Sequence, residues 1–94
     1  MSESEARGFL TAQLADYRGL SYAQLVALIG EPSIRELTGE SGTQYQLEIE
    51  PIWDHKKGGL VRVLGMITDG TLRSFVSPWT DDFLVAPDGS FVGE

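Results

Sequence analysis

The chain has 94 residues, of which 41% are hydrophobic and 10% aromatic, and its formal net charge is −7. A chain of this length has enough interior for one small core, so we expect a single α+β domain over residues 1–94. The negative charge argues against nucleic-acid binding, because a phosphate-binding surface needs clustered Lys and Arg. The absence of cysteine excludes disulfides and thiolate sites, and no apolar segment approaches the roughly 20 residues that span a bilayer.

The N-terminal segment predicts a helix and not a targeting sequence. Ser2 followed by Glu5 has the form of a capping box, and apolar side chains then recur at helical spacing. We therefore expect a helix from about Ser4 to Tyr17. The stretch from Met1 to Arg7 is acidic and has no basic flank before an apolar run, so it does not have the form of a signal peptide. We expect a soluble, cytoplasmic protein.

A second, shorter helix follows. Ser21 and Gln24 form another capping-box match, and the residues after them are largely apolar on every side. We therefore expect a mostly buried helix. Gly30 with Pro32 two residues beyond is a stop signal, so this helix should end near Ile29.

Two consecutive runs within Gln44–Thr71 alternate between apolar and polar residues, which is typical of strands. The run at 44–53 has one apolar and one polar side. The run at 60–67 is apolar on both sides, so we expect it to be central in a sheet and covered on both faces. The polar, glycine-rich turn at 54–59 predicts that the two runs form a hairpin. The segment 31–43 has only a weak pattern, in which Ile34 and Leu37 could anchor a turn or a short strand, and we interpret it as a connection.

Proline and glycine residues predict where the strands end. Pro51 removes a ladder donor, so we expect a strand edge, a bulge or a strand end there, and Trp53 should lie outside regular pairing. Asp69 and Gly70 favour a two-residue type I′ turn, which predicts a hairpin into Leu72–Val76. The segment 82–94 predicts one more small hairpin at the edge of the sheet.

The order of the elements predicts the fold class. Helices come first and strands follow, which indicates an α+β protein with two N-terminal helices packed on one face of an antiparallel β-meander of about three to five strands. A parallel sheet is excluded, because the gaps between the expected strands are too short for crossover connections.

No catalytic, cofactor-binding or metal-binding set is predicted. His55 beside Asp54 suggests an acid–base pair, but we interpret His55 as an exposed turn residue, because a Lys- and Gly-rich turn offers no pocket. The carboxylates do not have metal-ligand spacing. The glycines fit turns better than a phosphate cradle, since there is no Gly-x-Gly-x-x-Gly string and Gly58-Gly59 precedes an expected strand and not a helix.

The two tryptophans lie where regular strands should end, and they admit two interpretations. They complete a small core, or one of them stays partly exposed as an anchor for another protein. We name four candidate partner-binding residues: Trp53, Asp54, His55 and Trp79. The net negative charge also admits two interpretations: it keeps the protein soluble, or it complements a basic protein partner.

These observations favour a small protein-interaction module of inhibitor, immunity or adaptor type, which binds a partner through an acidic or aromatic sheet surface. A homodimer is a related hypothesis, because the C-terminal edge strand could pair with its copy. The rival hypothesis is a small-molecule-binding domain or an enzyme with a pocket between helices and sheet. In that hypothesis the polar contacts are Tyr17, Tyr45, Glu48 or His55.

One segment resembles known families. The residues that carry the likeness are Tyr22, Leu25, Leu28, Gly30, Glu31 and Pro32. They are similar to the helix-then-Gly-x-Pro segment of the small lipoproteins that assist outer-membrane β-barrel assembly and of β-lactamase inhibitor protein. The stretch from Tyr45 to Trp53 resembles the aromatic first strand of the meander in those families, and the likeness covers roughly residues 21–75. The chain has no counterpart of the lipoproteins' anchoring cysteine, and no functional residue carries over. The resemblance implies a compact module whose sheet surface contacts proteins.

Overall fold

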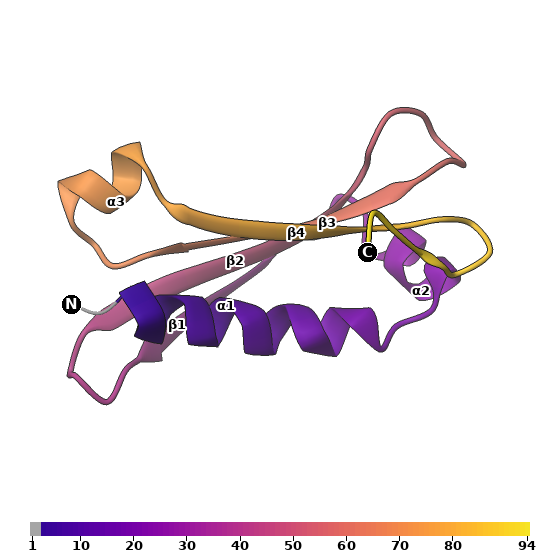
Figure 1. Cartoon of the computed structure of the whole chain (residues 1–94). Helices are drawn as coiled ribbons and strands as arrows, with labels where there is room; N and C mark the ends of the chain where they lie inside the picture. The colour runs from indigo at the N-terminus through magenta and orange to yellow at the C-terminus, as the bar shows by residue number, and fades with distance from the viewer. Residues whose placement is uncertain (1–2) are drawn as a thin grey trace.

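The computed structural model describes residues 3–94, except for the side chain of Phe75, and has an α+β fold with one antiparallel sheet (Figure 1). Ser2, expected in the first capping box, lies outside the described residues. The elements are α1 (Glu3–Arg18), α2 (Tyr22–Ala27), β1 (Ser33–Thr38), β2 (Gln44–Trp53), β3 (Val61–Thr68), α3 (Leu72–Val76), β4 (Trp79–Val85) and β5 (Phe91–Val92). The strands lie in the sheet in chain order, and each neighbouring pair is antiparallel. The predicted fold class is confirmed.

Helix α1 lies along one side of the sheet (Figure 1). Its acidic first turn and the basic Arg18 in its last turn complement the helix dipole. Ala6, Leu10 and Leu14 recur every four residues, and all three are buried against the sheet. The expected helical stripe is therefore the face that α1 buries.

Helix α2 starts as expected and ends earlier. The Ser21 side chain accepts a hydrogen bond from the Gln24 backbone at 3.1 Å, and the Gln24 side chain accepts one from the Ser21 backbone at 2.8 Å. The helix ends at Ala27, and Gly30 adopts a positive φ of 87°. Only Leu25 is buried. The expectation of a mostly buried helix was wrong, because a helix this short packs one side chain into the core while its alanines face solvent.

The core lies between α1, α2 and the sheet. Successive side chains of a strand point to opposite faces, and the inward set on β2 and β3 is almost fully buried. The buried apolar residues are Ala6, Leu10, Leu14, Leu25, Tyr45, Leu47, Ile49, Val61, Val63, Ile67, Phe83 and Val85. Gly65, also on this inner side, lies directly beneath α1, where a Cβ atom would come within 2.6 Å of Leu10 Cδ1. The helix thus packs close to the sheet because one central residue has no side chain.

Glu5 links the start of α1 to the turn between β1 and β2. Its carboxylate accepts hydrogen bonds from the Ser41 hydroxyl and from the Tyr45 hydroxyl, both at 2.7 Å. The bond from Ser41, followed by that from Tyr45, lowers the pKa of Glu5 below its usual value of 4.5. This contact joins two elements that are far apart in the sequence.

Strand β3 is central, as expected, but only one of its faces is covered. Leu64 on the other face is 37% exposed, and Arg62 and Met66 beside it are partly exposed. The expectation of cover on both sides was wrong, because both N-terminal helices pack on the same side of the sheet. The apolar residues on the other side of β3 therefore face outward.

Two segments have a different structure from the one expected. Residues 33–38, within the predicted connection, form β1, whose middle residues Arg35 and Glu36 are exposed and so conceal the alternation. The predicted hairpin into 72–76 is wrong, because these residues form α3. The Thr71 side chain caps α3 by accepting a hydrogen bond from the Ser74 backbone.

The structure also tests the predicted ends of the strands. Pro51 lies inside β2, beyond the point where β1 pairs, so at Pro51 the strand has only β3 as a neighbour, as on a sheet edge. Trp53 pairs with Val61, so the expectation that it lies outside regular pairing was wrong. The hairpin predicted in 82–94 is confirmed by β4 and β5. The C-terminal edge strand β5 has only two residues, whereas the opposite edge, β1, has six.

Candidate functional site

The four candidate partner-binding residues lie at two ends of the sheet. Trp53 is the last residue of β2, and Asp54 and His55 follow it into the turn, where His55 is exposed. Trp79 begins β4 and pairs with Ile67 on β3, six residues along that strand from the partner of Trp53. At about 3.3 Å per residue, the two tryptophans are roughly 20 Å apart. The structure brings the first three together and leaves Trp79 at the other end.

Both tryptophans face the helices. Their strand partners Val61 and Ile67 belong to the core, and both indoles pack against the core while staying partly exposed. Glu3 of α1 also interacts with Trp79. This arrangement gives both rings a packing role in the core.

The polar residues named for a ligand pocket between helices and sheet do not converge. Tyr45 points toward α1 and donates its hydroxyl to Glu5, whereas Glu48 lies on the opposite side of β2. Tyr17 is partly buried beside the core, and His55 is in an exposed turn. The structure therefore distributes this set over four places.

The side of the sheet away from α1 has no helix packed along it, and we call it the open face. The register of the strands places every second residue there. Its apolar members are Ile34, Ile52, Leu64, Met66, Leu84 and Val92, and its acidic members are Glu36, Glu48, Glu50 and Asp82. Ile34, Leu64 and Val92 are 56%, 37% and 38% exposed. The open face therefore combines exposed apolar side chains with carboxylates.

Apolar and acidic residues alternate across the strands of the open face. Met66 lies opposite Glu48, and Leu64 lies between Glu50 on one neighbouring strand and Asp82 on the other. Side chains directly opposite one another in an antiparallel pair have Cβ atoms about 5 Å apart. Each exposed apolar residue of β3 thus has at least one carboxylate next to it.

Within the strands that the structure describes, the open face contains one cation, Arg62, and that cation is already paired. Its guanidinium donates to Asp54 at 2.9 Å from Nε and also pairs with Asp82. Hydrogen bonding first to Asp54 and then to Asp82 raises the pKa of Arg62 above its ordinary value. The remaining carboxylates of the open face, Glu36, Glu48 and Glu50, have no cationic partner among the described residues.

Both ends of the open face are raised. In Figure 1 the helix α3 and the turn between β2 and β3 rise on the side of the sheet away from α1. Pro78, just after α3, lines a cavity of about 200 Å³ together with Gln46, Glu48, Met66 and Thr68. Leu72 and Val76 on α3 are 79% and 78% exposed and add apolar surface at the same end.

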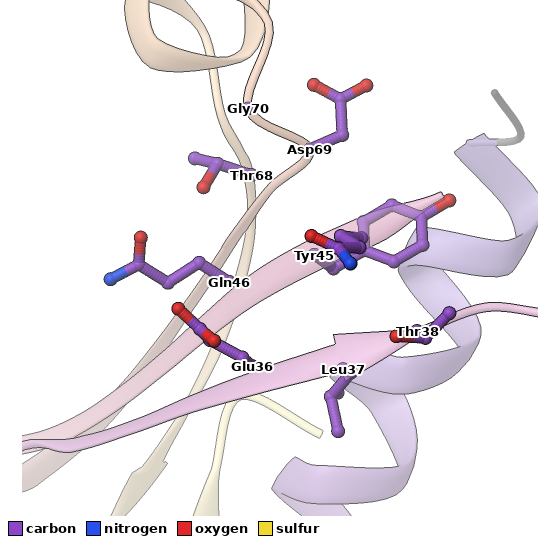
Figure 2. A pocket seen from close by; sticks show the side chains of 9 residues that line it. Glu36, Leu37, Thr38, Tyr45, Gln46, Thr68, Asp69 and Gly70 are labelled. Atoms are coloured by element: carbon purple, nitrogen blue, oxygen red, sulfur yellow. The ribbon is translucent and has the colours of Figure 1, made fainter. Parts of the chain in front are cut away.

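A larger cavity of about 460 Å³ adjoins this one and shares Gln46 and Thr68 with it (Figure 2). Its remaining lining comes from β1, from the start of β2 and from the turn after β3: Glu36, Leu37, Thr38, Gln44, Tyr45, Asp69 and Gly70. A hydrogen bond from Thr71 lowers the pKa of Asp69 more than burial raises it, and a weaker contribution from Ser74 lowers it further. The carboxylate is therefore anionic at neutral pH.

Neither a metal site nor a membrane span is found in the described part of the chain. No group of three or more His, Cys, Asp or Glu side chains in residues 3–94 is placed to hold a metal ion. Over the same residues, every helix is too short or too polar to cross a bilayer.

Comparison with known protein families, with curated proteins and with solved structures finds no match for this chain. The fold class therefore comes from the structure alone: the protein is an α+β domain with a helical layer on one face of a five-stranded antiparallel meander. The likeness to the β-barrel assembly lipoproteins and to β-lactamase inhibitor protein stays a prediction.

The sequence contains the residues of the open face, but the pattern along the chain does not predict that they lie side by side. The polar side of β2 was read as simply facing water, and the second apolar side of β3 was read as covered. Register is the missing information, because it places Glu48 opposite Met66 and Glu50 opposite Leu64. A sequence signal for such a face is a strand that is apolar on both sides, followed or preceded along the chain by a strand that is acidic on one side.

Proposed function

We propose that this protein is an interaction module that binds a basic, amphipathic segment of another protein on its open face. The observation that carries the proposal is the pattern of that face. Exposed apolar side chains lie next to carboxylates, and Arg62, the one cation among its described strands, is already paired with Asp54 and Asp82.

The apolar part of the face supplies a reason to bind. Contiguous apolar patches on a soluble protein commonly mark interaction sites, because burying each Å² yields about 25 cal/mol. Leu64 and Met66 lie next to each other on one face of the central strand, and Leu84 continues the patch onto β4. A partner that covers them gains contact area from two strands.

The charges select the kind of partner. A partner with acidic residues would place like charges against Glu36, Glu48 and Glu50, which costs free energy in a partly dehydrated interface. A partner with Lys or Arg beside its apolar residues makes favourable pairs with the same groups. The net charge of −7 also speeds the approach of a basic partner at low ionic strength.

The size of the face favours a helix as the bound element. Five strands spaced about 4.8 Å apart, with six to ten residues in the longer ones, give a surface roughly 20 by 25 Å. An amphipathic helix of four turns is about 20 Å long and 10 Å wide with its side chains, so it fits between the raised ends. Its apolar stripe covers Leu64 and Met66, and its basic residues flank that stripe.

The test uses a synthetic 18-residue peptide of Leu and Lys, with Leu at helical spacing, titrated into isotope-labelled protein and followed by NMR. We expect saturable shift changes at the open-face residues of β2, β3 and β4. A scrambled peptide of the same composition, which has no apolar stripe, should bind at least tenfold more weakly. Shift changes confined to the α1 side would refute the proposal.

A pair of charge-matched variants separates the face from the overall charge. The double variant E48K/E50K changes two carboxylates of the open face, whereas E31K/E40K changes two exposed carboxylates outside it. Both variants raise the net charge by the same amount. We expect E48K/E50K to weaken peptide binding more than tenfold and E31K/E40K to weaken it less than threefold. Equal losses would show that the peptide senses only net charge.

A further inference from the structure

The row of residues Glu36, Gln46 and Thr68 crosses three neighbouring strands at one end of the open face. Glu36 lies opposite Gln46, and Gln46 lies opposite Thr68. Figure 2 shows their side chains projecting to the same side of these strands, while Tyr45 points toward α1 and Asp69 points away from the row. With Glu48, Met66 and Pro78 they line what we call the end groove, formed by the two adjoining cavities.

The polar groups of the end groove lack a cation. Glu36 and Glu48 lie diagonally across β1 and β2, and at such positions Cβ atoms are about 7–8 Å apart. Neither carboxylate has a hydrogen-bond or ion-pair partner within the described residues. Residues that line the two cavities include no Lys, Arg or His. One carboxylate therefore lines each of the two adjoining cavities, Glu36 the larger and Glu48 the smaller, and no described cation neutralises either one.

The Thr68 hydroxyl in the same place opens into the end groove and is free to bind a ligand. Thr68 is only 9% exposed and lines both cavities, yet its side chain makes no hydrogen bond within the described part of the chain. Because no described side-chain oxygen is both buried and unpaired, the Thr68 oxygen is open to the cavity and can bond to water or to a ligand there. Gln46 beside it offers an amide oxygen as a second neutral acceptor. A bound group that donates several hydrogen bonds satisfies all of these atoms together.

The two ends of the end groove differ in polarity. Met66 and Pro78 form an apolar wall in the smaller cavity, which Glu48 also lines, whereas Glu36 lies in the larger cavity and Gln46 and Thr68 line both. Lysine and arginine have this same division, with an aliphatic stem and a cationic head. The stem packs along Met66 and Pro78 while the head lies between Glu36 and Glu48.

The geometry points to the end groove as a receptor for one lysine or arginine side chain of the bound segment, with Glu36 and Glu48 as counter-ions and Thr68 and Gln46 as acceptors. This inference rests on the proposed function, because it assigns one basic residue of the partner to a specific place on the open face. It adds a specificity determinant to a surface that otherwise selects by general charge.

The direct test uses small probes and needs no partner. N-acetyl-lysine methylamide, N-acetyl-arginine methylamide and N-acetyl-norleucine methylamide are titrated into labelled protein, and NMR shifts of Gln46, Met66 and Thr68 are followed. We expect saturable shifts with the two cationic probes and at least fivefold weaker effects with norleucine, which has the stem without the charge. The ratio of the lysine to the arginine affinity identifies the preferred head group. Equal shifts from all three probes would overturn the inference.

Variants of the end groove test the named residues. E36Q removes one carboxylate with almost no change of shape, and E31Q makes the same change at an exposed site outside the groove. We expect about threefold weaker binding of the lysine probe to E36Q, about tenfold to E36Q/E48Q, and no change for E31Q. T68V keeps the shape of Thr68, and we expect it to weaken the probe about threefold. Unchanged affinity in both E36Q/E48Q and T68V would refute the assignment.

The Leu/Lys peptide distinguishes this inference from the proposed function. If the peptide binds the open face but its affinity is unchanged in E36Q/E48Q and T68V, the end groove is not a receptor while the proposed function stands. If the peptide does not bind but the lysine probe occupies the end groove, the proposed function fails and the groove stands as a cation site.

Discussion

Replacing Gly65 by alanine tests how the helical layer is held on the sheet. The added Cβ would lie 2.6 Å from Leu10 Cδ1, 3.0 Å from Ile49 Cδ1 and 3.3 Å from Leu14 Cδ2, where carbon atoms normally stay 3.5–4.0 Å apart. Those three side chains are buried and have little room to move. Overpacking of this kind costs about 1–3 kcal/mol, and alanine regains about 0.5–1 kcal/mol of backbone entropy in the unfolded chain. We expect a net loss of about 1–2 kcal/mol.

The matched control is Gly8→Ala on the exposed side of α1. A Cβ at Gly8 meets nothing within 4 Å, and alanine is about 1 kcal/mol better than glycine inside a helix. Urea unfolding, followed by circular dichroism and tryptophan fluorescence, should therefore show G8A stabilised and G65A destabilised. For a domain of this size 1 kcal/mol moves Tm by about 4–8 °C. A G65A variant as stable as the parent, together with a stabilised G8A, would show that α1 does not lie on Gly65.

A second substitution locates the source of the G65A effect. Leu10→Ala removes the atom that the new Cβ meets first, at the cost of a cavity in the parent protein. In the double variant, the alanine at position 65 fills part of that cavity. The two losses should therefore be less than additive, by about 1 kcal/mol or more. If the two losses in the free energy of unfolding were additive, the destabilisation by G65A would not come from the contact with Leu10.

Three further substitutions test contacts that define the fold. Glu5→Gln should lower Tm relative to the parent, and the full difference in Tm should be present above about pH 4.5. The difference should shrink as the pH falls further, because the folded-state pKa of Glu5 is lowered and the stabilising effect of its carboxylate is lost on protonation. A difference in Tm that grows toward acid pH would contradict this. Ser21→Ala removes the capping box with Gln24 and should cost about 1 kcal/mol in urea unfolding. Tyr22→Phe removes the 2.7 Å hydrogen bond from the tyrosine hydroxyl to the Gly59 carbonyl and should cost about 1 kcal/mol, whereas no change would place this hydroxyl in solvent.

The parts of the fold that the sequence predicted are those where burial enforces a period. Alternation in β2 and β3 follows from one inner face that is almost completely buried. Strand β1 gave no such signal, because it is an edge strand with four exposed residues among six. Segment 69–76 was misread because Asp69-Gly70 suits a type I′ turn, while the Thr71 side chain, which caps α3, is a competing local signal.

The candidate site was harder to predict than the fold, for a physical reason. Trp53 and Trp79 stood out as large side chains near strand ends, and the structure uses both beside the core. The carboxylates Glu48 and Glu50 looked like ordinary solvent-facing residues of a strand. Their position beside Leu64 and Met66 depends on the register between strands, which no single segment specifies.

The acidic residues of the open face would oppose the pairing of two copies of the protein through that face. If two copies met face to face, the carboxylates of Glu36, Glu48 and Glu50 would lie against the same set on the other copy, in addition to the repulsion between two molecules of charge −7. A basic partner meets attraction from the same groups, so one set of carboxylates opposes self-association and favours the partner. Because the Debye length is about 8 Å at physiological ionic strength, this discrimination acts mainly at contact and does not depend on long-range fields. It therefore depends on which residues lie next to Leu64 and Met66, and much less on the total charge of the chain.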